Sequence, residues 1–159
     1  MAERGDYRGA SAWVCEMRLR RGTAVVRAAM LAGPPWAAMR KLAARAEREG
    51  THPTLRPLVL EVFSCLLVTP SRGNQPSEAT KARVVLRDGL RCVRCGGTER
   101  LHVDHLFPRL LGGCHLEWNL ATLCAPCNLA KGHELHGWAL LRMINQGEAY
   151  EATHHQQDT

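Results

Sequence analysis

Hydrophobic residues recur at helical spacing through the first 50 residues of the chain. An Arg-rich segment at residues 11–30 has apolar positions compatible with one amphipathic helix or two, with a break near Gly22 and a stop at Gly33 and the two prolines after it. Residues 36–49 are rich in Ala, Leu, Arg, Lys and Glu and are followed by Gly50. Strong helix formers that end at a glycine predict a helix with a left-handed cap. We therefore expect this part of the chain to be mainly helical.

Two further apolar segments flank a linker in the middle of the chain. The run at residues 58–68 is too short for its pattern to separate a buried helix from a strand, and we favour a helix. Residues 71–76 have the Ser, Gly, Asn and Pro content of a linker. Ser77 then stands where a helix N-cap would, and the apolar positions after it predict a helix over residues 78–87.

Beyond residue 90 the helical spacing gives way to short segments separated by glycines. Residues 101–105 alternate apolar and polar positions, as a half-buried strand does, and residues 120–123 can form a returning strand. A glycine-containing loop joins them at residues 106–118. Pro126 suits the first turn of a helix that begins around residues 124–126. The pattern predicts a β-hairpin packed on a helix.

The length of 159 residues suits one ordinary domain, or a small domain with a helical extension. Charged residues recur from Glu3 to Arg21, which argues against a signal peptide. The longest apolar stretch, at residues 58–68, contains Glu61 and falls short of the roughly 20 residues that span a bilayer. We expect a soluble, cytoplasmic protein with no membrane partner.

The charge of the chain favours an anionic partner. Lys and Arg number 21 against 15 Asp and Glu, a formal balance of +6. Residues 1–75 hold 12 of the basic and 6 of the acidic residues, so they carry the entire excess. A basic N-terminal half is what phosphate contacts with DNA would need.

Cysteine spacing predicts a metal site. The count of seven is odd, which argues against a complete disulfide framework. Two C-x2-C pairs lie 28 residues apart, at Cys92, Cys95, Cys124 and Cys127. One tight turn can aim both sulfurs of such a pair at the same ion, and four thiolates complete the shell of a structural Zn²⁺. The alternatives are two unrelated pairs of buried thiols and a thioredoxin-like dithiol, which would need a βαβ pattern around it.

The order of residues between and after these pairs resembles a known family. The matching positions are Val103-Asp104-His105, Pro108, Gly112-Gly113, Asn119, Asn128 and Lys131-Gly132. With the two C-x2-C pairs they resemble the HNH family of nucleases, the ββα-metal or His-Me finger group, in its four-cysteine zinc form. The resemblance covers about residues 80–132, roughly a third of the chain.

The resemblance implies a role for each polar residue of the motif. His105, with an ordinary pKa near 6.5, corresponds to the general base. Asp104 and Asn128 correspond to oxygen ligands of a divalent cation, and Asn119 to the amide that ties the loop back and orients the histidine strand. Lys131 could place an ammonium beside the scissile phosphate, or it could be a solvated lysine on a helix surface.

The motif departs from the family's eponymous pattern at its last position, where Asn128 stands in place of a histidine. Two oxygens without an imidazole suit hard cations, so we expect Mg²⁺ or Mn²⁺ as the catalytic ion. Among the remaining histidines, His102 is expected at the surface, and His133 and His136 are expected to cap or decorate a helix.

Together these patterns predict an α+β fold: a zinc-stapled ββα-metal unit preceded by a mainly helical, basic N-terminal region. We expect residues 1–75 to form that region, residues 76–145 the nuclease domain and residues 146–159 a polar flexible tail. The predicted function is metal-dependent endonucleolytic hydrolysis of DNA. The alternatives are a zinc-stabilised module that binds nucleic acid or protein, and an accessory subunit that cuts only within a larger assembly with a protein partner, as in phage packaging.

Overall fold

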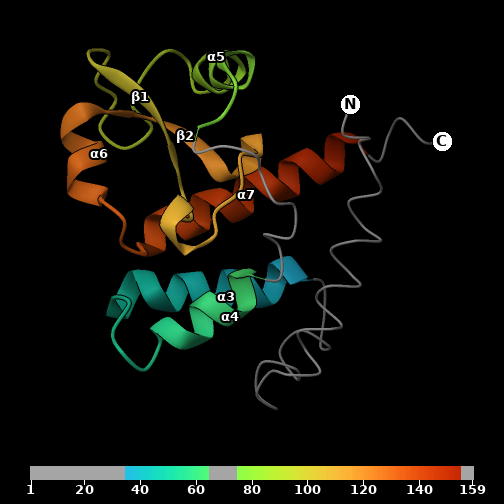
Figure 1. Cartoon of the computed structure of the whole chain (residues 1–159). Coiled ribbons are helices and arrows are strands. Elements are labelled where there is room, and N and C mark those ends of the chain that lie inside the picture. Colours follow the sequence, from blue (N-terminus) through green and yellow to red (C-terminus); the bar gives the residue numbers. More distant parts are fainter. Residues whose placement is uncertain (1–34, 65–74, 155–159) are drawn as a thin grey trace.

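The computed structural model describes the backbone of residues 35–64 and 75–154, and the fold is α+β (Figure 1). Helices α3 (Pro35–Glu49) and α4 (Arg56–Ser64) lie side by side and run in opposite directions. Gly50, directly after α3, has a φ of 75°. Both predicted helices are confirmed where they are described. The helix expected at residues 11–30 and the end of the apolar run at residues 65–68 lie outside the described residues.

The predicted hairpin and the helices on either side of it are present. Helix α5 (Glu78–Arg87) begins at Ser77, whose side chain accepts a hydrogen bond of 3.2 Å from the Thr80 backbone N–H, as an N-cap does. Strands β1 (Leu101–His105) and β2 (Leu120–Cys124) pair antiparallel and are followed by α6 (Ala125–Lys131). The loop between the strands contains two short 3-10 helices, η1 (Arg109–Leu111) and η2 (Glu117–Asn119).

The last described element is a long helix, α7 (Gly137–His154). It continues through residues 146–154, the first part of the segment for which the sequence predicts a polar flexible tail. The side chain of Gln146 donates to the carbonyls of Trp118 and Leu120, each at 3.0 Å, and Arg40 on α3 forms an ion pair with Glu148. These contacts with other elements stabilise the helix in a segment whose polar composition is typical of a tail.

Helix α7 lies between the α3–α4 pair on one side and the hairpin with α5 and α6 on the other (Figure 1). One cluster of buried residues spans both sides of it. Its members include Met39, Ala43, Val59, Phe63, Phe107, Trp118, Leu140 and Met143. The described helices α3 and α4 therefore share a core with the hairpin and the helices around it instead of forming one of their own. None of the described helices is long and apolar enough to cross a membrane.

Helix α7 approaches the backbone of α3 closely at Gly137. A Cβ atom at this position would lie 2.2 Å from the Glu47 backbone nitrogen and 2.4 Å from its Cα. Both of these atoms belong to the backbone of α3, so they cannot move aside as a flexible side chain would. Only glycine permits this approach.

We expect Gly137→Ala to lower the free energy of unfolding by about 1–3 kcal/mol, because the added methyl group forces the two helices apart. Helix propensity alone would give the opposite sign, a gain of up to about 1 kcal/mol. Denaturant unfolding with the linear extrapolation measures the change. Adding Glu47→Ala should not restore stability, since the crowded atoms remain; a stabilised Gly137→Ala variant would contradict the close approach.

Candidate metal centre and active site

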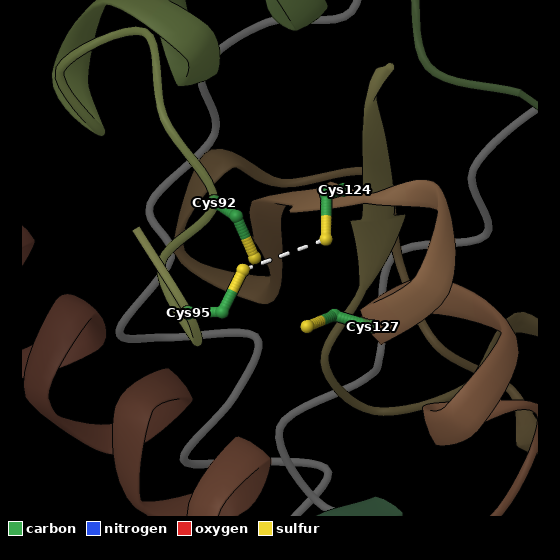
Figure 2. A group of neighbouring side chains, drawn as sticks. All are labelled: Cys92, Cys95, Cys124 and Cys127. Atoms are coloured by element: carbon green, nitrogen blue, oxygen red, sulfur yellow. Dashed lines mark hydrogen bonds between the residues drawn. The ribbon is translucent and has the colours of Figure 1, made fainter. Parts of the chain in front are cut away.

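Four cysteines from two separate turns point their sulfurs toward one another (Figure 2). The Sγ atoms of Cys92, Cys95, Cys124 and Cys127 all lie within 4.8 Å of one another, and those of Cys95 and Cys124 are 3.6 Å apart. Tetrahedral coordination with Zn–S bonds of about 2.3 Å places sulfurs about 3.8 Å apart, so the cluster fits a structural zinc ion with four thiolate ligands.

The local backbone explains why these turns converge. The Gly96 N–H donates to the Cys92 carbonyl at 2.8 Å, and Gly96 has a φ of 78°, so the first turn closes tightly. The Val93 N–H donates to the Thr122 carbonyl at 2.9 Å, which fastens this turn to β2. Cys124 ends β2 and precedes the first residue of α6, and the helix then carries Cys127. Strand pairing and the start of a helix together bring the second pair to the first.

The electrostatics of the cluster favour a bound cation. Burial raises the pKa of the Cys92 thiol, but backbone N–H groups of Cys124, Cys95 and Arg94 outweigh burial and lower it to about 6. The pKa of Cys127 is raised to about 12, first by the hydrogen bond with Cys124 and then by burial and the other two sulfurs. Four crowded thiols cannot all ionise by themselves, and a divalent cation supplies the charge that allows it.

His105, at the end of β1, is buried beside a second histidine. Its Nε2 lies 2.8 Å from Nδ1 of His115, and the two ring centroids are 5.1 Å apart. Burial first, and then the charge of His115, lower the pKa of His105 to about 4, while the Asp104 carboxylate opposes them. The imidazole is therefore neutral near pH 7, which is the form that can accept a proton.

Asp104 and Lys131 form an ion pair between β1 and α6. The Lys131 ammonium donates to Asp104 Oδ2 at 2.8 Å and to the Gly132 carbonyl at 3.3 Å. The Lys131 side chain is 1% exposed and that of Asp104 is 26% exposed. Lys131 is thus not the solvated surface lysine that the sequence left as an alternative. Because α6 packs on β1, its last turn carries the ammonium to the carboxylate.

The two asparagines of the motif occupy different settings. Asn119 is fully buried and holds the loop after β1: its Oδ1 accepts from the Phe107 N–H at 2.8 Å, and its Nδ2 donates to the carbonyls of Phe107 and Cys114 at 3.2 and 3.0 Å. Asn128 is partly exposed on α6. It lies three residues before Lys131, so both project from the same face of the helix.

The sequence patterns did not mark His115 as a site residue. It lies in the loop between the strands, with no spacing that marks it as a partner of His105. The signal that could have found it is the preceding Gly113, where a Cβ atom would lie 2.0 Å from the Phe107 carbonyl oxygen. A glycine that the loop needs for a close turn indicates that the loop folds back toward the end of β1.

The other histidines agree with the sequence-based expectation. His102 and His133 are exposed. A ring nitrogen of His136 lies 2.9 Å from the Lys131 carbonyl oxygen, so His136 caps the end of α6.

Comparison with protein-family models matches residues 92–134 to the family described as HNH endonuclease. The matched segment contains all four cysteines, both strands, the loop between them and α6. It indicates a nuclease-type function for this part of the chain. No curated protein and no solved structure matches the chain.

We expect one tightly held Zn²⁺ per chain, because a site formed only in the folded protein contributes its binding energy to folding. Cys95→Ser and Cys127→Ala should each lose the ion and the cooperative thermal transition. Metal analysis by mass spectrometry and thermal unfolding measure both effects. Cys114→Ala is the matched control, since Cys114 is a buried cysteine outside the cluster and its loss should leave the zinc content unchanged. Folded, reduced protein with less than half an equivalent of zinc would contradict the metal centre.

The ion pair predicts an asymmetry between its two partners. Asp104→Ala leaves the ammonium of Lys131 buried without a counter-charge, which we expect to cost about 3–5 kcal/mol of the free energy of unfolding. Lys131→Met keeps the packing of the alkyl chain and leaves a carboxylate that water can reach, at a cost on the order of 1 kcal/mol. Denaturant unfolding of the two variants tests the ranking. If Lys131→Met were more destabilised than Asp104→Ala, the result would contradict the finding that the ammonium of Lys131 is buried.

Proposed function

We propose that this protein is a metal-dependent endonuclease that hydrolyses phosphodiester bonds of DNA, by nicking or by cleavage of both strands. One observation carries the proposal: a neutral, buried imidazole at the end of β1 adjoins a partly exposed carboxylate, inside a segment that matches the HNH endonuclease family. A base and an anionic oxygen ligand side by side are what water-mediated cleavage of a phosphodiester requires.

In this reaction His105 acts as the general base. Its imidazole removes a proton from a water molecule, whose oxygen forms a bond to phosphorus as the bond to the leaving oxygen on the opposite side breaks. The leaving oxygen then takes a proton from solvent. Because burial lowers the pKa of His105, its imidazole is already unprotonated at neutral pH and can accept the proton directly.

Asp104 and Asn128 would hold the catalytic cation, Mg²⁺ or Mn²⁺. Such an ion, when bound, stabilises the negative charge that develops on the phosphate oxygens. Oδ2 of Asp104 is occupied by Lys131, whereas no described residue hydrogen-bonds its Oδ1, which therefore remains for a metal. The adjacent ammonium repels a dication, so we expect weak metal affinity and a requirement for millimolar Mg²⁺.

Charge supports DNA as the partner. Residues 1–75 carry the whole basic excess of the chain, 12 basic against 6 acidic residues. Phosphate contacts from this region would add affinity without sequence information. Thiolate ligands of zinc persist in a reducing compartment, which supports the cytoplasm as the place of action.

A second candidate function is a zinc-stabilised module that binds nucleic acid or protein, or that cuts only within a larger assembly. The Lys131–Asp104 ion pair favours this alternative, because a carboxylate neutralised by a buried ammonium is a poorer metal ligand. A partner or substrate would then have to change that pair before an ion could bind.

The test is cleavage of supercoiled plasmid with Mg²⁺ or Mn²⁺ by the wild type and His105→Ala. We expect the variant to be about 10²–10⁴-fold slower, the usual contribution of a general base, while zinc content stays near that of the wild type. His102→Ala is the matched control, since His102 is exposed on the same strand and should not matter. Equal rates for wild type and His105→Ala would remove His105 from the mechanism. A wild type that binds DNA but does not cut it would instead support the binding module.

A further inference from the structure

Beyond the motif, the geometry points to His115 as a positioning residue for the general base. This inference rests on the proposed function, because a positioning residue has meaning only for a group that reacts. His115 holds Nε2 of His105 and thereby leaves Nδ1 as the nitrogen available to accept a proton from the attacking water. It does not touch the substrate in this role.

The 2.8 Å contact joins one nitrogen of each ring, so a single proton lies between Nε2 of His105 and Nδ1 of His115. When His105 donates this proton, its Nδ1 keeps a lone pair and can accept a proton from water. When His115 donates it, Nε2 of His105 is engaged as an acceptor and Nδ1 carries the hydrogen, so neither nitrogen can act as a base. Only the first arrangement is compatible with catalysis, and it requires His115 Nδ1 to be an acceptor.

The two residues before His115 in the loop, Gly113 and Cys114, are held in place by hydrogen bonds. The Gly113 N–H donates to the Pro108 carbonyl at 3.0 Å, and the Arg109 guanidinium donates to the Gly113 carbonyl at 3.1 Å. Asn119 donates to the carbonyl of Cys114, the residue directly before His115. With the carbonyls of both preceding residues bonded, the backbone at His115 is fixed, as a preorganised site requires.

Burial strengthens the consequence of this contact. His105 is 6% exposed, so water cannot easily replace a lost partner at Nε2. No other described residue hydrogen-bonds the His105 ring, so without His115 the ring could rotate or change tautomer. Outer partners that orient a reacting or ligating histidine contribute about 10- to 100-fold in activity.

The experiment compares two substitutions of His115 in the full chain. His115→Phe keeps an aromatic ring without a nitrogen, and we expect kcat for plasmid nicking to fall about 10- to 100-fold with KM unchanged. His115→Asn places an amide oxygen close to the position of Nδ1, and we expect it to recover most of that loss. Equal losses in both variants, or a change confined to KM, would overturn the positioning role.

A double variant separates this role from a direct contact with DNA. In a His105→Ala background, His115→Phe should have no further effect on the rate, because a residue that acts through His105 has nothing left to position. Multiplication of the two effects would mean that His115 acts independently of His105, and would overturn the inference.

NMR of the histidine side chains provides a measurement that does not depend on cleavage. We expect a slowly exchanging Nε2–H proton for His105 in the wild type and its disappearance in His115→Phe. A His105 ring with its hydrogen on Nδ1 would overturn the inference even if the enzyme is active. A wild type that cuts no DNA would overturn the proposed function, and the NMR result would then decide the histidine pairing by itself.

Discussion

The central constraint of this structure is the meeting of two cysteine turns around one point. Two strands of five residues cannot form a stable hairpin in water by themselves. Cys124 stands at the junction of β2 and α6, and Cys92 and Cys95 follow the end of α5. A single ion bound there would fasten the hairpin to the helices on both sides of it. The positions of Asp104 and His105 on β1 depend on the hairpin being held in this way.

The strand register then distributes the reactive groups. Successive residues of a strand point to opposite faces, so the neighbours Asp104 and His105 meet different partners. Asp104 reaches Lys131 on α6, whereas His105 reaches His115 in the loop between the strands. Two neighbouring residues thus have different partners, because a helix covers one face of the strand and a loop covers the other.

Two buried polar side chains near this site, Asp88 and Asn119, are paired with groups of other segments, whereas the hydroxyl of Thr122 is buried without a hydrogen-bond partner among the described residues. The Asp88 carboxylate, 1% exposed, accepts from the Thr122 N–H at 2.8 Å and pairs with Arg87, so α5 is fixed to β2. Asn119 does the same for the loop, with three hydrogen bonds. Burial of an unpaired polar group would cost about 1–3 kcal/mol, so each partner is a condition for the geometry of the site. These pairings hold β2 and the loop before it, against which His105 and Asp104 lie, in one arrangement.

Much of this protein could be predicted from its sequence, and the residues involved show why. The cysteine pairs, the N-cap at Ser77 and the alternation over residues 101–105 are local patterns, in which the chemistry of a few neighbouring residues determines the conformation. The partners of Asp104 and His105 are not local. Lys131 is 27 residues from Asp104, and His115 is brought to His105 by a loop turn that Gly113 permits. The extension of α7 through residues 146–154 likewise depends on contacts with α3 and with the start of β2. The sequence by itself thus determined the elements and the metal ligands, whereas the pairing of the charged and titratable groups was decided only by tertiary structure, because contacts between distant segments obey packing and not spacing.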